Sequence, residues 1–250
     1  MKLILTLLSF FLITFGFAQE STLQFEQANQ YYRSGDYQKA IQMYEQVIKN
    51  GYSSPALYYN LGNSYFKIQN VPAAILNFER AKRLDPNDDD INYNLRLANL
   101  RVIDKIEPIP RLFFIAWWQS FINLFSSEGW AIAGIIGLWF AAISAASIFV
   151  LRSSVFQRIA FLVSIFVFLI SILAFIGMYQ RIHYEQNEST GIIFSATVSV
   201  KSAPDSQSTD LFVLHEGVKV EFLDAVGEWK KIRLADGKVG WLPSKDIQTI

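Results

Sequence analysis

The sequence predicts a multidomain membrane protein with an all-α repeat region, a two-helix transmembrane hairpin and a C-terminal all-β barrel. Residues 28–48 and 62–82 align at a shift of 34 residues, which is typical of a helical repeat. Residues 129–151 and 159–180 are uncharged and apolar, and each run is long enough to cross a bilayer as a helix. Residues 191–250 change to an alternating β-pattern with turn signals between short strands.

The overall composition argues against several classes of protein. Of the 250 residues, 52% are hydrophobic, which is too apolar for one ordinary soluble domain. Lys and Arg together number 22, as do Asp and Glu, and there is no basic run, so no nucleic-acid partner is expected. The absence of cysteine removes disulfides, cysteine-ligated zinc, thiol catalysis and a lipid-modified N-terminal cysteine.

Residues 1–18 are typical of a secretory signal peptide. Lys2 supplies the charged start, residues 3–15 are apolar, and residues 16–18 form a small-x-small cleavage site. An uncleaved anchor is the alternative, although the apolar run is shorter than the roughly 20 residues that span a bilayer. Both interpretations export the chain that follows.

Residues 19–105 are expected to form two helical repeats and a capping helix. The aligned pairs are Ala28/Gly62, Tyr31/Tyr65, Tyr32/Phe66, Ala40/Ala74, Ile41/Ile75, Tyr44/Phe78, Glu45/Glu79 and Val47/Ala81. These pairs and the period of 34 resemble the tetratricopeptide repeat. A further shift brings residues 93–95 under residues 59–61, and the pattern then fades into the capping helix. Because such repeats usually need three units for stability, we expect this region to be stabilised by contact with a partner, a second copy or the membrane surface.

The resemblance to tetratricopeptide repeats implies a peptide-binding groove lined by the first helix of each repeat. The groove residues that it implies are Phe25, Asn29, Tyr32, Arg33, Tyr59, Asn63, Phe66, Lys67, Tyr93 and Arg101. Some of them, together with Asn60, partly resemble the set with which such repeats hold a C-terminal carboxylate. Phe25 departs from that set, which has a lysine at this position. The alternative is that the aromatic residues pack one repeat on the next.

Residues 106–128 are expected to combine a linker with an amphipathic helix at the membrane interface. Pro108 and Pro110 separate the segment from the repeats. The polar residues that share one helical face are Gln119, Ser120, Asn123 and Ser127. The aromatic residues are largely elsewhere, which favours a helix that lies in the interface with its tryptophans at headgroup depth.

Residues 129–151 and 159–180 are predicted to be transmembrane helices joined by the loop 152–158. The loop carries Arg152 and Arg158 without an acidic residue, and positive charge favours the cytoplasmic side. We therefore expect an inner-membrane protein whose N- and C-terminal domains lie in the periplasm. A buried helix pair of a soluble protein is the alternative.

Small residues recur every four positions along the first predicted span: Ala133, Gly137, Ala141 and Ala145. Such a stripe lets a second helix approach closely. The second span and a helix of another protein are both possible partners, and a chance pattern in an alanine-rich helix is the alternative.

Residues 191–250, which follow a linker at 181–190, are expected to form five short strands of a small barrel. A hairpin turn is predicted at Ala235-Asp236-Gly237. The stretches VSVKSAP, LHEGVKVEFL, EWKKIRL and GWLP resemble the bacterial SH3 family, whose domains often bind peptides or cell-wall fragments. Trp229 and Trp241 are the candidate ligand surface, and a role in the core and its rim is the alternative.

The sequence gives no indication of catalysis, so no enzyme, cofactor-binding residue or metal ligand is expected. It has no glycine-rich phosphate loop, no His-Glu metal spacing and no nucleophile elbow. The two histidines, His183 and His215, are placed in different parts of the chain. The acidic run 88–90 is expected to cap the helix that follows it.

Taken together, the domain order and the WWQSFINLFSS stretch resemble the BatE family of the Bacteroides aerotolerance operon. That resemblance implies partners with von Willebrand factor A domains in the membrane and, through them, a MoxR-type ATPase. It also implies a role in tolerance of oxidative or envelope stress. The resulting hypothesis is a non-enzymatic scaffold in the lipid bilayer, and the alternative is an envelope receptor whose SH3-like domain binds peptidoglycan or stem peptides.

Overall fold

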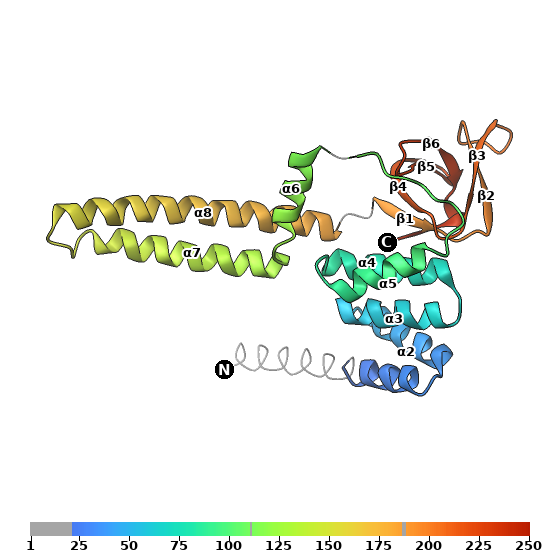
Figure 1. Cartoon of the computed structure of the whole chain (residues 1–250), viewed down its shortest axis with the longest axis horizontal. Coiled ribbons are helices and arrows are strands. Elements are labelled where there is room, and N and C mark those ends of the chain that lie inside the picture. The colour runs from blue at the N-terminus through green and yellow to red at the C-terminus, as the bar shows by residue number, and fades with distance from the viewer. Residues whose placement is uncertain (1–21, 111, 187–188) are drawn as a thin grey trace, which may run out of the picture. The chain divides into compact units, whose positions relative to one another are not determined.

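A computed structural model describes residues 22–110, 112–186 and 189–250, so the expected signal peptide lies outside the described residues. The chain divides into two compact units. One unit joins the repeat region, up to Ile109, to the β-domain, from Glu188 onward, and the other contains residues 110–187. Figure 1 shows the helical repeats in blue to green and the β-domain in orange to red. The predicted fold class, with helical repeats, two long apolar helices and a C-terminal antiparallel β-domain, is confirmed.

The repeat region consists of consecutive short helices, and α2 to α5 each begin at a polar cap. A first helix covers residues 22–33, and it is followed by α2 (Tyr37–Lys49), α3 (Pro55–Lys67), α4 (Val71–Leu84) and α5 (Asp89–Asn99). The caps of these four helices are Asp36, Ser54, Asn70 and Asp88, whose side chains accept hydrogen bonds from backbone N–H groups of the first turn. Such caps satisfy donors that a helix cannot pair internally. The acidic run at 88–90 therefore has the capping role expected from the sequence.

The 34-residue period reappears as a repeated hydrogen bond between neighbouring first helices. Asn60 Nδ2 donates to Asn29 Oδ1 at 2.9 Å, and Asn94 Nδ2 donates to Asn63 Oδ1 at 3.0 Å. Both donor and acceptor are displaced by one repeat between the two bonds. Helix α5 therefore takes the place of the first helix of a third repeat, although its sequence pattern fades.

The β-domain contains seven strands among the described residues, two more than the sequence pattern suggested. In chain order they are β1 (Thr190–Ile193), β2 (Thr197–Lys201), β3 (Asp210–His215), β4 (Lys219–Val226), β5 (Trp229–Arg233), β6 (Val239–Pro243) and β7 (Ile247–Thr249). The sheet order is β3-β2-β6-β5-β4-β1-β7. The strands β1 and β7 have four and three residues, which is too short for an alternating pattern to be recognised. The predicted turn at residues 235–237 does join β5 to β6.

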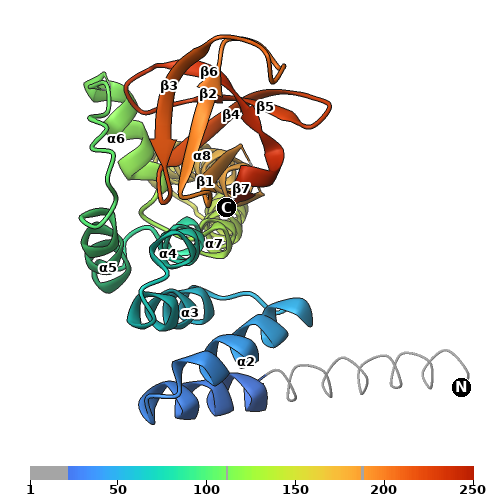
Figure 2. The same ribbon diagram turned by 90° about the vertical axis from the view of Figure 1, so that its right-hand side faces the viewer.

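The repeats and the β-domain share one hydrophobic core. The buried cluster combines Ile75 and Phe78 of α4 and Leu95 of α5 with Ile192 and Val220 of the sheet. In both views α4 lies nearer to the β-domain than α2 does (Figures 1 and 2). The repeat region was expected to be stabilised by a partner, a second copy or the membrane, and in the structure it packs against the β-domain of the same chain. Sequence pattern could not predict this because the two segments are separated by the apolar helices.

Polar contacts of Glu79, Arg80, Arg83 and Asp104 surround this shared core. Arg80 and Arg83 donate to the carbonyl oxygens of Thr249 and Ile250, at 2.8 and 2.6 Å. The other two contacts are Lys219–Glu79 at 2.7 Å and His215–Asp104 at 3.0 Å. The turn at Gly217 packs directly on the repeat region, because a Cβ there would lie 2.9 Å from Val102 Cγ2 and 3.3 Å from Ile75 Cδ1 of α4. Gly217 also has a φ of +88°, so both space and backbone conformation favour glycine.

The second unit contains α6 (Phe113–Ile122), α7 (Ser127–Ser147) and α8 (Ser154–Gln186). The last two are long and apolar enough to cross a membrane, and 17% of the most apolar stretch of each is buried. The boundaries differ from the expected ones. Helix α7 ends at Ser147, and Gln157 Nε2 donates to the carbonyl oxygens of Ile148 and Leu151 in the connection. Helix α8 continues to Gln186 through most of the expected linker 181–190, where Arg181 and Glu185 form an ion pair one turn apart.

Helices α7 and α8 pack as an antiparallel pair through small residues. Gly137 and Ala141 face α8, whereas Ala133 is exposed and the neighbouring Gly134 packs under Phe175 in its place. The half-buried Ala145 completes the contacting face. A strict four-residue stripe drifts around a helix of 3.6 residues per turn, so the contacting positions 134, 137, 141 and 145 include one step of three. The predicted stripe is thus occupied largely by the second helix of the hairpin itself.

Candidate functional site

The predicted groove residues lie on the first helices of the repeats, except Arg101, which lies in the turn just after α5. They differ in how far a partner could reach them. Arg33, Lys67, Tyr93 and Arg101 are exposed, with Tyr93 59% exposed. The half-buried members are Phe25, Asn29, Tyr32, Tyr59, Asn63 and Phe66. The exposed members form the surface that a partner can reach, and the others form its floor.

Most aromatic residues of this floor also pack between helices. Tyr59 lies 6.0 Å from Phe78 between ring centroids, and Phe25 lies 5.9 Å from Tyr44. Burial raises the pKa of Tyr32 and, more strongly, that of Tyr44, so both phenols stay protonated at neutral pH. These rings therefore have the packing role that the sequence left open as the alternative.

The asparagines of the floor have a fixed orientation. The Oδ1 atom of Asn29 accepts from Tyr44 Oη and Asn60 Nδ2, and Asn63 Oδ1 accepts from Asn94 Nδ2. An asparagine whose oxygen is occupied presents its amide N–H groups as donors. The adjacent cations are Arg33, Lys67 and Arg101, the last of which lies 4.5 Å from the ring of Phe66. The surface thus offers donors and positive charge, which suit an acidic or carbonyl-rich segment.

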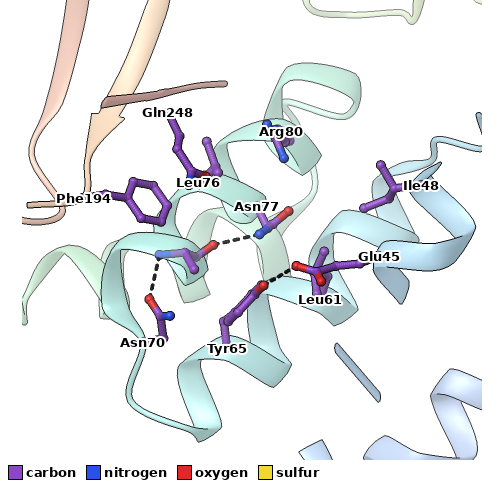
Figure 3. A pocket seen from close by; sticks show the side chains of 11 residues that line it. Glu45, Ile48, Leu61, Tyr65, Asn70, Leu76, Asn77, Arg80, Phe194 and Gln248 are labelled. Carbon is purple, nitrogen blue, oxygen red and sulfur yellow. Dashed lines mark hydrogen bonds between the residues drawn. The ribbon is translucent and has the colours of Figure 1, made fainter. Parts of the chain in front are cut away.

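A cavity of about 430 Å³ lies where the repeats meet the β-domain. It is lined by Glu45, Ile48, Leu61, Tyr65, Asn70, Ala73, Leu76, Asn77, Arg80, Phe194 and Gln248 (Figure 3). Tyr65 Oη donates to the Glu45 carboxylate, and burial followed by this bond raises the pKa of Tyr65. Sequence reasoning missed the cavity, although Asn77 is a polar residue within the apolar run AILNF of α4 and could have marked it.

The two tryptophans proposed for the SH3-like ligand surface share one face of the β5–β6 hairpin. In the strand register Trp229 is opposite Pro243, and Trp241 is opposite Lys231. The intervening Ile232 and Leu242 are fully buried, so the alternating tryptophans lie on the outer face. Trp229 and Trp241 are half-exposed, with Lys231 Nζ 5.8 Å from the Trp241 ring centroid. This face offers an aromatic surface beside the Lys231 cation.

A buried polar network in the second unit was not predicted. The Arg181 side chain is fully buried, and its Nε lies 3.0 Å from Glu185 Oε1. Arg181 Nη1 also donates to Asn123 Oδ1 at 3.2 Å, and Ser127 Oγ donates to Glu185 Oε2 at 2.9 Å. The network joins the segment after α6 to the start of α7 and the end of α8. Asn123 and Ser127, which were expected on the polar face of the interfacial helix, therefore form hydrogen bonds within the second unit.

The two histidines belong to different units of the chain. His215 Nδ1 lies 3.0 Å from Asp104 Oδ1 at the repeat–β-domain contact, whereas His183 belongs to α8. Within residues 22–110, 112–186 and 189–250 there is no group of three or more His, Cys, Asp or Glu side chains placed to hold a metal ion.

Comparison with known protein families agrees with the two domains. The tetratricopeptide repeat model matches residues 25–89, and the bacterial SH3 domain model matches residues 196–248. A search of curated proteins finds no match to the chain. Both domain types are interaction modules that are typically non-catalytic, and two apolar helices between them suggest insertion in a membrane. The chain therefore contains a tetratricopeptide repeat region and a bacterial SH3 domain, separated in sequence by two membrane-type helices.

Proposed function

We propose that this protein is a non-enzymatic inner-membrane scaffold that recruits membrane-protein partners through its repeat groove. The observation that supports this most directly is the row of exposed groove residues above a fixed asparagine floor. Its donors and cations suit an acidic segment of a partner, since electrostatic complementarity directs partner choice. Following the resemblance to the BatE family, the partners are membrane proteins with von Willebrand factor A domains, which link the scaffold indirectly to a MoxR-type ATPase.

The groove is tested with a variant that changes its surface and leaves its floor intact. We expect Lys67→Glu/Tyr93→Ala to reduce recovery of its membrane partner about tenfold or more. The reason is that it reverses one charge and removes one exposed aromatic side chain, each of which can contribute more than 1 kcal/mol at an interface. The measurement is affinity purification of the full-length protein in mild detergent, with mass spectrometry of the co-purifying proteins.

The matched control is Lys49→Glu/Tyr52→Ala, which makes the same two changes at exposed positions in and just after α2. It is expected to retain the partners of the unmodified protein. Equal losses in both variants, or no loss in either, would contradict recruitment by the groove. Tyr59 is left unchanged because it packs against the shared core.

We further propose that the repeats and the SH3 domain both lie in the periplasm, with the α7–α8 connection in the cytoplasm. Supporting this, the two domains share a core and must fold on the same side of a membrane, which an even number of spans permits. Arg152 and Arg158 near the connection favour the cytoplasmic side for it. The proposed function depends on this arrangement.

The orientation can be tested with single cysteines, because the natural sequence contains none. Ser53→Cys, Ser206→Cys and Ser153→Cys each replace an exposed serine, in the repeats, the β-domain and the α7–α8 connection respectively. We expect a membrane-impermeant maleimide to label the first two in spheroplasts, and to label Ser153→Cys only after permeabilisation. The opposite pattern would place the domains in the cytoplasm.

A second candidate function is an envelope receptor in which the SH3 domain binds peptidoglycan or stem peptides. It is favoured by the outward face that carries Trp229 and Trp241, since aromatic surfaces suit such ligands. Co-sedimentation of the full-length protein with cell-wall sacculi separates the candidates. Retention that is lost in Trp229→Ala/Trp241→Ala supports the receptor, whereas a pure scaffold is not retained.

A further inference from the structure

The cavity between the repeats and the β-domain is lined by a buried hydrogen-bond acceptor, the side-chain oxygen of Asn77, that has no partner among the described residues. The Asn77 side chain is 3% exposed, and its Nδ2 donates to Ala73 O at 2.8 Å. Its Oδ1 has no hydrogen-bond partner among the residues that the structure describes. A buried polar atom without a hydrogen bond destabilises the folded protein by on the order of 1–3 kcal/mol, so the presence of an asparagine at this position calls for an explanation.

The lining of the cavity supplies complementary groups around that acceptor. Figure 3 shows Asn77 and Arg80 on α4, with Glu45 and Tyr65 from the neighbouring helices. Glu45 is exposed and presents a carboxylate, whereas Arg80 presents a guanidinium that also donates to Thr249 O. Opposite charges thus flank a neutral acceptor. The apolar part of the lining is formed by Ile48, Leu61, Leu76 and Phe194.

We propose that this cavity binds a zwitterionic amino acid or short peptide with an aliphatic side chain. The ligand ammonium would pair with Glu45, its carboxylate with Arg80, and one of its N–H groups would donate to Asn77 Oδ1. The side chain would contact the apolar lining. A volume of about 430 Å³ lies at the small end of the range for ligand sites, which fits one or two residues. This site is separate from the groove and does not depend on the scaffold function.

Because the cavity lies between the repeats and the β-domain, a ligand bound there would affect how the two associate. Its lining comes from α2, α3 and α4 on one side and from Phe194 and Gln248 of the β-domain on the other. A ligand that contacts both sides would strengthen the association of the repeats with the SH3 domain. A ligand that binds only the folded state also raises thermal stability, by an amount that grows with the logarithm of the ligand concentration.

The test uses the full-length protein in lipid nanodiscs with three probes: L-leucine, glycyl-L-leucine, and N-acetyl-L-leucine amide, which lacks both charges. Ligand-observed saturation-transfer NMR and calorimetry measure binding. We expect at least one zwitterion to bind about tenfold more tightly than the capped compound. Preference for leucine identifies an amino acid as the ligand, and preference for the dipeptide identifies a peptide.

Two variants assign binding to this cavity. Asn77→Leu and Glu45→Gln are each expected to weaken binding about tenfold, while Asn63→Ala, which removes an amide from the groove, leaves it unchanged. Asn77→Leu is also expected to raise the unfolding temperature, because it removes the unpaired acceptor at similar volume. A lower unfolding temperature would indicate that Asn77 is a structural residue and would contradict the proposal. Absence of binding by all three probes at millimolar concentration would indicate a water-filled cavity and would overturn it.

Discussion

Replacing Ile75 with aspartate is expected to unfold the repeats and the SH3 domain together. Ile75 is fully buried in α4 and belongs to the core that both domains share, where it packs beneath the Gly217 turn. Truncation of a buried isoleucine alone costs about 2–5 kcal/mol, and a buried unpaired carboxylate adds a desolvation penalty. We therefore expect a loss of at least about 3 kcal/mol, which corresponds to roughly 100-fold faster amide exchange where exchange requires unfolding.

Hydrogen exchange with mass spectrometry on the full-length protein measures this effect separately in each element. Protection is expected to fall in α4, α5 and the strands β1 and β4 alike. The matched control is Ile103→Asp, which places the same charge at a side chain that is 67% exposed and is expected to change little. If exchange rose in the helices while the strands stayed protected, the two domains would be independent and the shared core would not determine their stability.

Replacing Arg181 with leucine is expected to destabilise the junction of α6, α7 and α8 by about 3–5 kcal/mol. The substitution removes one partner of a buried ion pair, and Glu185, whose side chain is 19% exposed, then loses its cation. It also removes the hydrogen bond to Asn123. The expected result is faster exchange in residues 119–130 and 178–186, with no change in the middle of either long helix.

The double variant Arg181→Leu/Glu185→Leu is the internal control for this interpretation. Replacing both members of a buried ion pair by apolar residues of similar volume is often neutral or stabilising. The double variant should therefore recover most of the stability lost in Arg181→Leu. Equal destabilisation in both variants would show that the shape of the arginine side chain, and not its charge, supports the junction.

The architecture was predictable from the sequence because each part has a pattern of its own. The 34-residue shift depends on small residues at helix crossings, for example Gly62, where a Cβ would lie 2.7 Å from Phe78 Cδ1. The apolar spans follow from length and lack of charge, and the β-domain follows from alternation and from its turn at Gly237. These are local signals, which require only neighbouring residues.

The candidate sites were predictable to different degrees. The groove positions follow from the repeat register, yet the bonds that fix Asn29 and Asn63 involve partners about one repeat away. That Trp229 and Trp241 share one outer face could be predicted only with the strand register, which the structure supplies. Arg181 directly follows the predicted span 159–180, and the sequence could not show that Asn123 and Glu185 lie beside it.

The sequence by itself determined the helical repeats, the apolar hairpin and the SH3 domain, since each arises from short-range periodicity. Only the tertiary structure decided that the SH3 domain completes the core of the repeats. This packing depends on contacts such as Arg80 with Thr249 and Ile75 with the Gly217 turn, which join residues more than 100 positions apart in the sequence. The cavity around Asn77 exists for the same reason, because its two walls come from opposite ends of the chain. Periodicity describes the face that each element buries, and it carries no information on which distant element covers that face.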